Sequence, residues 1–369
     1  MKILLLPNAL KGSLRSTQVI TIFTHALPRT HALRSLPISD GGDGFIDFFC
    51  TLDPHARLVY TTAKNAFLKN KRTSFLLLSD EKTAIIETAR ICGLGTTKNN
   101  ELNPLYASSY GVGQVILKAI QKGAKRIYIG LGGVACNDGG AGMAVACGAK
   151  LLDGRNTPLP LGAKPLLSLE QLDLSALQKN LKGVQLFGIT DVTNPLLGPK
   201  SSAKVFGPQK GANARDVKIL DKAMARWAQA IRRTTGQSIS HVPGTAAAGA
   251  IGAGLLGCMC AQLLPGSDFL LQKTPLEKQA QWADLLITCE GKLDDQTLYG
   301  KAPLAVLKLA KKYKKPALFI CGQCALSPKK LSSYAPCVVI ALTDFAKNEQ
   351  DAKKHAGRIM ARACKTLFS

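Results

Sequence analysis

The 369-residue sequence is poor in aromatic and in acidic residues. Phe, Trp and Tyr make up 6% of it, and 24 Asp and Glu stand against 48 Lys and Arg, which gives a formal charge of +24. Proteins that bind nucleic acids usually combine basic residues with aromatic side chains that stack on bases. The shortage of aromatics therefore argues against specific nucleic-acid binding, and the charge instead indicates a solvated basic surface that attracts small anions.

Long apolar runs and paired histidines are also missing. No run approaches the ~20 residues of a membrane-spanning helix. The apolar run from Lys2 to Leu6 is too short for a signal peptide, so it predicts a first strand. The five histidines are scattered and indicate no zinc site. We expect a cytoplasmic protein with no membrane partner, whose eleven cysteines stay reduced, the pair Cys321 and Cys324 included.

Strand-like and helix-like segments alternate at both ends of the chain, a pattern that favours βαβ units around a parallel sheet. The middle is less regular, and the apolar runs 73–78 and 84–87 predict a hairpin. We expect an α/β protein in which residues 1–58 and 285–369 form a Rossmann-like parallel-sheet domain. Residues 59–284 are expected to form an inserted mixed α/β domain. The sequence leaves open whether the protein is a monomer or a homo-oligomer.

The segment that most strongly indicates a ligand-binding site follows an expected strand: residues 130–143 read GLGGVACNDGGAGM. Glycines let backbone amides approach a ligand and adopt positive φ without steric cost. Asn137 and Asp138 lie in this turn, where Asp138 either contacts a cation or a substrate hydroxyl or caps the next helix. Residues Gly130 to Ala135 also match the dinucleotide fingerprint, which supports an NAD(P)-dependent dehydrogenase as an alternative, although a true fingerprint opens its helix at once.

Two turns near the N-terminus carry further candidates. Lys11 and Ser13 follow the first strand and can contact a phosphate or carboxylate at a helix N-terminus, unless Ser13 simply caps that helix. Asp40 and Asp43 lie in a glycine-rich turn after the second strand, and their oxygens suit Mg²⁺ or a hydroxyl group. The alternative for Asp43 is a helix cap.

Polar groups also follow three later strands or turns. Asp191 stands at the end of an apolar strand, as a candidate base or metal ligand, with an Asx-turn as the alternative. Lys210 lies in a Gly- and Pro-framed turn as a candidate anion contact. The small-residue segment 243–254 leads into a helix expected over 248–263. A last strand exit carries several groups that can bind a polar ligand: Glu290, Lys292, Asp294, Gln296, Thr297 and Lys301.

Taken in order, these segments resemble the type I bacterial glycerate kinase family, which phosphorylates D-glycerate with ATP. The resemblance is carried by six motifs that follow one another over nearly the whole chain. They are PNALKGS at 7–13, DGGDG at 40–44, GGVACNDGGAGM at 132–143, DVTNPLLG with FGPQKG between 191 and 211, the small-residue segment 245–255, and 288–303.

The resemblance implies two α/β domains with a cleft between them, and ATP-dependent phosphorylation of D-glycerate on the 2-hydroxyl, giving 2-phosphoglycerate, although the residues alone leave the 2- and 3-hydroxyl open. Such a reaction needs phosphate contacts, Mg²⁺ and a carboxylate near the attacking hydroxyl. We assign catalysis to Asp191, Lys11 and Asp138, and Mg²⁺ to Asp40 and Asp43. The substrate or phosphate contacts are expected to be Ser13, Asp40, Gly41, Gly42, Asn137, Lys210, Glu290, Lys292, Asp294 and Lys301.

The sequence departs from the family pattern inside several of these motifs. Asn8 stands where the family usually has Asp, and an amide cannot ionise or accept a proton at neutral pH. Val134 replaces a serine and removes a hydroxyl from the glycine-rich turn at residues 130–143, called the central turn below. The other departures are Asp43 for Glu, and Ala248, Ala250 and Cys289 for glycine. A catalytically impaired homologue is therefore a further alternative.

Overall fold

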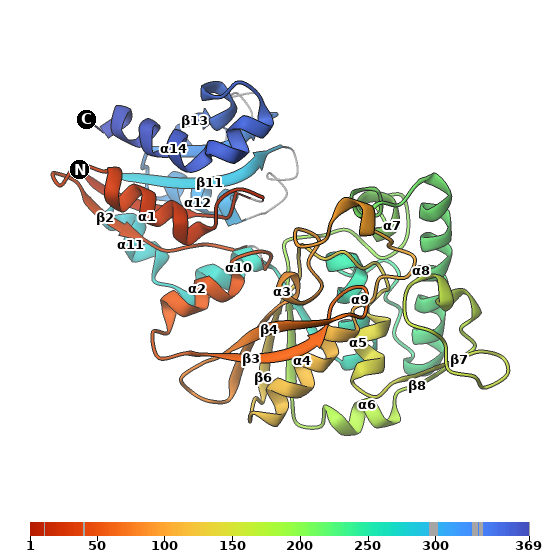
Figure 1. The fold of residues 1–369 in the computed structure, drawn as a ribbon. Coiled ribbons are helices and arrows are strands. Elements are labelled where there is room, and N and C mark those ends of the chain that lie inside the picture. The colour runs from red at the N-terminus through yellow and green to blue at the C-terminus, as the bar shows by residue number, and fades with distance from the viewer. Residues whose placement is uncertain (11, 40, 295–301, 327–330, 332–334, 369) are drawn as a thin grey trace. The chain divides into compact units, whose positions relative to one another are not determined.

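The computed structural model describes residues 1–10, 12–39, 41–294, 302–326, 331 and 335–368 (Figure 1). The chain folds as two compact units, which are described separately. Unit 1 comprises Met1–Pro54 and Pro265–Ser369, and unit 2 comprises His55–Leu264. Unit 1 resumes at Pro265, earlier than the expected bound of 285, because the short helices α10 (Gly266–Lys273) and α11 (Leu276–Trp282) belong with the chain ends.

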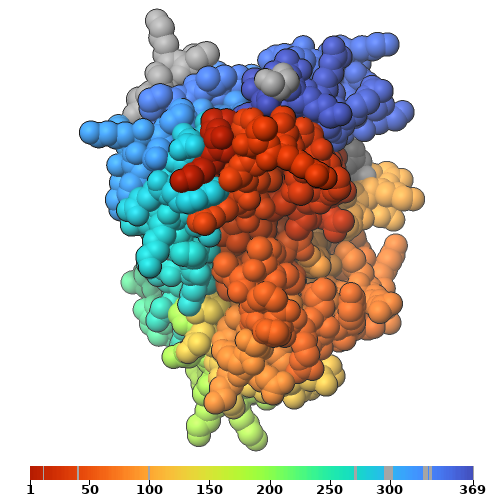
Figure 2. All heavy atoms as spheres, turned by 90° about the vertical axis from the view of Figure 1, so that its left-hand side faces the viewer, coloured from red at the N-terminus to blue at the C-terminus, as the bar shows by residue number. Residues whose placement is uncertain are grey.

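Unit 1 is built on a five-stranded parallel sheet in the order β13-β12-β11-β1-β2. Its strands are β1 (Lys2–Pro7), β2 (Ala32–Ser35), β11 (Leu285–Leu293), β12 (Ala317–Cys324) and β13 (Cys337–Ala341). The apolar run of β1 is buried after Lys2, as a central strand covered on both faces requires. In Figure 2 the red N-terminal residues lie against cyan residues of the C-terminal segment, in agreement with the pairing of β1 with β11.

Both chain ends therefore share one parallel sheet, which confirms the expected α/β class. Numbered within the unit, the strands follow the order 2-1-3-4-5 of a doubly wound sheet, and the direction of winding reverses between β1 and β11. Among the described residues, the other α-helices of unit 1 are α1 (Ser16–Ala26), α2 (Phe45–Leu52), α12 (Ala302–Lys312) and α14 (Glu349–Phe368).

Unit 2 contains a six-stranded mixed sheet in the order β10-β9-β6-β5-β4-β3. Its strands are β3 (Arg57–Lys64), β4 (Asn70–Leu77), β5 (Thr83–Glu87), β6 (Arg126–Gly130), β9 (Gln185–Ile189) and β10 (Gln262–Leu264). Strands β5, β6, β9 and β10 run parallel, whereas β3, β4 and β5 pair antiparallel, which confirms the expected hairpin between β4 and β5. A small antiparallel pair, β7 (Lys150–Leu152) and β8 (Gln171–Asp173), stands apart from it.

Helices surround this sheet (Figure 1). They are α3 (Thr88–Cys92), α4 (Tyr110–Gln121), α5 (Ala141–Ala146), α6 (Ser175–Asn180), α7 (Ser202–Phe206), α8 (Ala214–Thr235) and α9 (Ala247–Met259). The longest, α8, begins at a capping box on Asn213 and ends at a left-handed Gly236, the usual signals of a helix start and stop. None of the helices in the described ranges is long and apolar enough to cross a membrane.

The helix expected over 248–263 is wrong at its start. Ala248, Gly249 and Ala250 have left-handed backbone angles, with φ of 52°, 63° and 64°, so regular α-helix begins only after them. The following glycines allow close packing: a Cβ atom at Gly254 would lie 2.8 Å from the Gly139 carbonyl oxygen, and one at Gly252 would lie 2.6 Å from that of Gly244. Close packing against neighbouring backbone therefore explains these glycines without a ligand.

Candidate active site

Parallel strands of unit 2 end in polar loops at one edge of its sheet. Open α/β sheets bind ligands at this carboxyl edge. Strand β5 ends at Glu87, β6 opens into the glycine-rich turn after Gly130, and β9 ends two residues before Asp191. This edge therefore brings two of the sequence-derived segments, the glycine-rich turn and the Asp191 loop, into one sheet layer.

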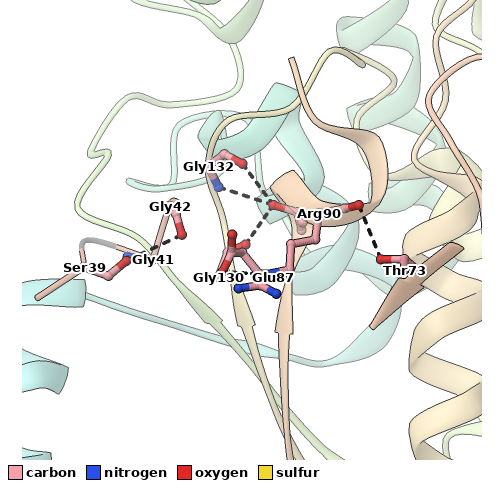
Figure 3. Close-up of polar contacts among 9 residues, drawn as sticks. Ser39, Gly41, Gly42, Thr73, Glu87, Arg90, Gly130 and Gly132 are labelled. Carbon is pink, nitrogen blue, oxygen red and sulfur yellow. Dashed lines mark hydrogen bonds and ion pairs between the residues drawn. The ribbon is translucent and has the colours of Figure 1, made fainter. Parts of the chain in front are cut away.

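The glycine-rich turn is held at its start by a threonine. The Thr88 hydroxyl lies 2.8 Å from the Gly130 carbonyl oxygen and 3.1 Å from that of Gly132. Beside these glycines, buried Glu87 forms an ion pair with Arg90 at 3.4 Å (Figure 3). The helix α5 begins only at Ala141, so the match of this turn to a dinucleotide fingerprint lacks the helix that must follow at once.

Asp138 is fully buried and ties the glycine-rich turn to the segment directly before α4. Its carboxylate accepts hydrogen bonds from the backbone and side chain of Ser109, at 2.8 and 2.9 Å, and from the Ser108 hydroxyl at 3.2 Å. The backbone N–H groups of Gly140 and Gly142 add two more, at 3.3 and 3.1 Å. One of these donors, Gly142, lies in the first turn of α5, whose N-cap residue is Gly140. Burial raises the pKa of its carboxyl group, while the hydrogen bonds from Ser109, Gly142 and Gly140 oppose the rise.

Asn137 lies in the same turn and is also fully buried. Its side-chain Oδ1 accepts a hydrogen bond of 2.8 Å from the hydroxyl of Ser202, the first residue of α7. Within the described part of the chain its Nδ2 has no hydrogen-bond partner. A buried, unsatisfied donor costs about 1–3 kcal/mol and is rare in native proteins, so this amide calls for a functional explanation.

Lys210 is buried at the end of a short 3₁₀ turn, Pro208–Lys210. Its Nζ donates a 2.6 Å hydrogen bond to the Cys136 carbonyl oxygen, and burial lowers the pKa of its ammonium group. A Cβ atom at Gly249 would lie 2.0 Å from the same carbonyl oxygen and 2.8 Å from Nζ. Gly249 is therefore required where the central turn, the Lys210 turn and the start of α9 meet.

Asp191 is partly buried beyond the carboxyl end of β9. The next backbone N–H, of Val192, donates to the Thr190 hydroxyl at 3.1 Å. Further along this loop, Leu196 N–H donates to the Thr245 hydroxyl at 2.9 Å, which fixes the loop to the segment before α9. Asp191 thus extends from a loop that is anchored at both ends.

In unit 1, the carboxyl ends of β1 and β11 meet at the point where the winding reverses. Backbone N–H of Asn8 donates to the Cys289 carbonyl oxygen at 3.1 Å, and Asn8 is buried with its Oδ1 accepting from Ala9 N–H at 2.9 Å. Glu290 follows Cys289 and is 8% exposed. Lys292 lies 4.0 Å from Asp294 with more than half of its side chain exposed. Such a reversal is where doubly wound sheets bind ligands.

Neither Ser13 nor Asp43 is the N-cap of the helix that follows it. Ser13 does not cap α1, because its hydroxyl donates to the Lys353 carbonyl oxygen of α14 at 2.9 Å and α1 is instead capped at Arg15. Helix α2 begins after a left-handed Gly44, so Asp43 is not its N-cap. In this turn Gly41 N–H donates to the Ser39 hydroxyl at 3.3 Å, and Ser39 lies beside Gly41 and Gly42 (Figure 3).

Lys11, Asp40, Gln296, Thr297 and Lys301 lie outside the described residues. In the part of the chain that the structure describes, no group of three or more His, Cys, Asp and Glu is arranged to hold a metal ion. All eleven cysteines are described and none forms a disulfide.

Several site residues escaped sequence reasoning, namely Thr88, Ser108, Ser109 and Ser202. Each of them hydrogen-bonds to a residue 29 to 65 positions away in the sequence. A single Ser or Thr in a sequence does not reveal such a distant partner. The pair Ser108 and Ser109 directly before the helix α4 was the one available hint, since serine is common at helix starts.

The fold and these loops define an α/β enzyme with polar, glycine-rich turns at the carboxyl ends of its parallel strands. A model of the glycerate kinase family matches residues 3–369. Glycerate kinase of Bacillus subtilis is 34% identical, over 100% of this chain and 97% of the relative. Glycerate 2-kinase of Escherichia coli is 36% identical, over 87% of this chain and 85% of the relative.

A solved structure agrees with these relatives. A crystal structure assigned as glycerate kinase 2 from Salmonella typhimurium superposes with a TM-score of 0.78 at 32% identity, and the match covers 100% of this chain and 98% of that one. The chain belongs to the glycerate kinase family and is a kinase. The dehydrogenase alternative is therefore set aside.

Proposed function

We propose that this protein transfers the γ-phosphoryl group of ATP to the 2-hydroxyl of D-glycerate, giving 2-phosphoglycerate and ADP. The carrying observation is the family match over residues 3–369. The choice of hydroxyl is supported by the name of the Escherichia coli relative, glycerate 2-kinase. Both substrates are anions, and a formal charge of +24 favours their approach.

Asp191 is proposed as the base. The glycerate hydroxyl oxygen forms a bond to the γ-phosphorus, the bond from that phosphorus to the bridging oxygen of ADP breaks, and the hydroxyl proton passes to the Asp191 carboxylate. The position of Asp191 beyond the end of β9, in an anchored loop, supports this role. Phosphoryl transfer depends mainly on positioning and charge, so the surrounding contacts carry most of the catalysis.

Asn137, Asp138 and Lys210 are proposed to act together in unit 2. Asn137 donates a hydrogen bond to a substrate oxygen. Asp138 contributes by holding the turn through its five hydrogen bonds. Lys210 stabilises the anionic substrates through its charge while its hydrogen bond fixes the Cys136 carbonyl group.

The phosphate contacts and the Mg²⁺ ligands are proposed to come from unit 1. The contacts are Lys11, Ser13, Asp40, Gly41, Gly42, Glu290, Lys292, Asp294 and Lys301. Asp40 and Asp43 would hold Mg²⁺, which would neutralise phosphate charge. This carboxylate pair suits the ion, because Mg²⁺ bound with a nucleotide keeps phosphate oxygens and waters as ligands and needs one or two carboxylates from the protein.

The test is ADP release, followed with a coupled assay, in the presence of ATP, Mg²⁺ and D-glycerate. We expect turnover, and phosphorus NMR of the product should show 2-phosphoglycerate. A 3-phosphoglycerate signal would refute the proposed hydroxyl and leave the kinase activity standing. A correctly folded protein without ADP release would instead support the impaired homologue that Asn8 and Val134 suggest.

A further inference from the structure

We propose that Ser202 is a positioning residue that orients the Asn137 amide, so that Asn137 Nδ2 donates to an anionic oxygen of a bound substrate. The inference deepens the proposed function and rests on it. It assigns a role to Ser202, which no motif singled out. The ligand chemistry is an acceptor oxygen, carried by the carboxylate of the hydroxy acid or by a phosphate of the nucleotide.

The first observation concerns the burial and hydrogen bonding of the Asn137 amide group. Asn137 and Ser202 are both 0% exposed, and the Ser202 hydroxyl donates to Asn137 Oδ1 at 2.8 Å. Among the described residues Asn137 Nδ2 is left without a hydrogen-bond partner. An acceptor oxygen supplied by the substrate would satisfy that donor and remove its desolvation cost.

The second observation is that the rest of the turn is fixed independently. Asp138 holds the turn on one side of Asn137 through Ser109 N–H at 2.8 Å. Lys210 holds the Cys136 carbonyl group on the other side at 2.6 Å. With the backbone held on both sides, rotation of its own side chain is the main freedom left to Asn137.

Ser202 removes that freedom. The two ends of an amide have nearly the same shape but opposite hydrogen-bonding character, and with the Ser202 hydroxyl donating to Oδ1 it is Nδ2 that faces away from Ser202. The helix that carries Ser202 does not depend on this bond. The neighbouring Ser201 hydroxyl caps α7 by accepting from Lys204 N–H at 3.4 Å, and it donates to Asp221 of α8 at 2.8 Å.

This arrangement gives a matched pair of variants on adjacent serines. Ser202→Ala removes the orienting bond and keeps the cap. Ser201→Ala removes the cap, which is expected to lower the Tm while leaving kcat/KM within about twofold, because typical caps affect stability by about 1 kcal/mol. If Ser202→Ala fails to fold, Ser202→Cys keeps nearly the same volume and replaces the hydroxyl by a weak donor.

The experiment is a double-mutant cycle of Ser202→Ala and Asn137→Ala. It is read as kcat/KM for D-glycerate and for ATP, and as the Kd of each ligand by calorimetry. We expect Ser202→Ala to lower kcat/KM or affinity about 10- to 100-fold for the one substrate that Asn137 contacts, the usual effect of losing one hydrogen bond to a charged group. In the Asn137→Ala background, Ser202→Ala should have less than about a twofold further effect.

Additive effects in the cycle would overturn the inference, as would a Ser202→Ala protein within twofold of the wild type in both readouts. An effect on D-glycerate alone assigns the oxygen to the hydroxy acid, and an effect on ATP alone assigns it to the nucleotide. Absence of turnover in the wild type would refute the proposed function, while the Kd cycle would still decide the role of Ser202.

Discussion

Replacing Ala248 by glycine is expected to stabilise the protein. Ala248 has φ 52° and ψ 51°, inside the left-handed region that L-residues other than glycine avoid. The clash of Cβ with the following carbonyl in this region costs about 1–2 kcal/mol. Ala248→Gly removes that clash, and its half-buried methyl group leaves little packing to lose.

The unfolded state reduces the gain. Glycine has more conformational freedom than alanine when unfolded, which costs about 0.4–1 kcal/mol on folding. The net gain in the free energy of unfolding is therefore about 0.5–1 kcal/mol. For a unit the size of unit 2, this corresponds to a rise in Tm of about 1–4 °C.

Differential scanning calorimetry of the wild type and Ala248→Gly measures this shift. The matched control is Ala253→Gly in the regular part of the same helix. There glycine costs about 1 kcal/mol and a buried methyl group is lost as well, so the Tm should fall. A Tm for Ala248→Gly that is equal to or below that of the wild type would refute the assignment of strain to this turn.

Three further predictions concern the same region. Gly249→Ala should lower the free energy of unfolding by at least about 2–3 kcal/mol in urea titrations, because its Cβ would lie 2.0 Å from the Cys136 carbonyl oxygen; a loss below 1 kcal/mol would contradict this packing. Asp138→Asn should destabilise by about 2–4 kcal/mol, since one amide oxygen cannot replace a carboxylate that accepts five hydrogen bonds, and wild-type stability would be the contrary result. Burial lowers the pKa of Lys210 below its usual 10.5, so between the folded pKa and 10.5 the unfolded chain binds more protons. The stability of the wild type relative to Lys210→Met should therefore rise as the pH increases towards 10.5, and a constant difference would contradict a lowered pKa of Lys210.

Local patterns were sufficient where a segment's structure is decided by its own residues. The apolar run of β1, the β4–β5 hairpin and the strand-to-turn exit at Gly130 were all predicted from periodicity and glycine content. The start of α9 was not, because alanine favours a helix locally while the packing of Gly249 against Cys136 imposes left-handed angles.

The long-range contacts that hold the site together could not be predicted from the sequence. Lys210 and Cys136 are 74 positions apart, and Ser202 and Asn137 are 65 apart. Asp138, Asn137 and Lys210 could be predicted as candidates from their residue types, because carboxylates, amides and ammonium groups bind polar ligands. Whether such a group faces a ligand or the protein depends on which distant segment folds against it, and no local spacing encodes that.

The two tryptophans fall one in each unit. Trp227 is buried in α8, and its Nε1 donates to the Gly139 carbonyl oxygen at 2.9 Å; Trp282, in α11, has the Arg34 guanidinium 4.1 Å from its ring centroid. Each unit therefore contains its own fluorophore. Trp282→Phe would leave Trp227, which contacts the central turn, as the only tryptophan that emits. Stopped-flow fluorescence could then time ligand-induced changes at this turn separately from those in unit 1.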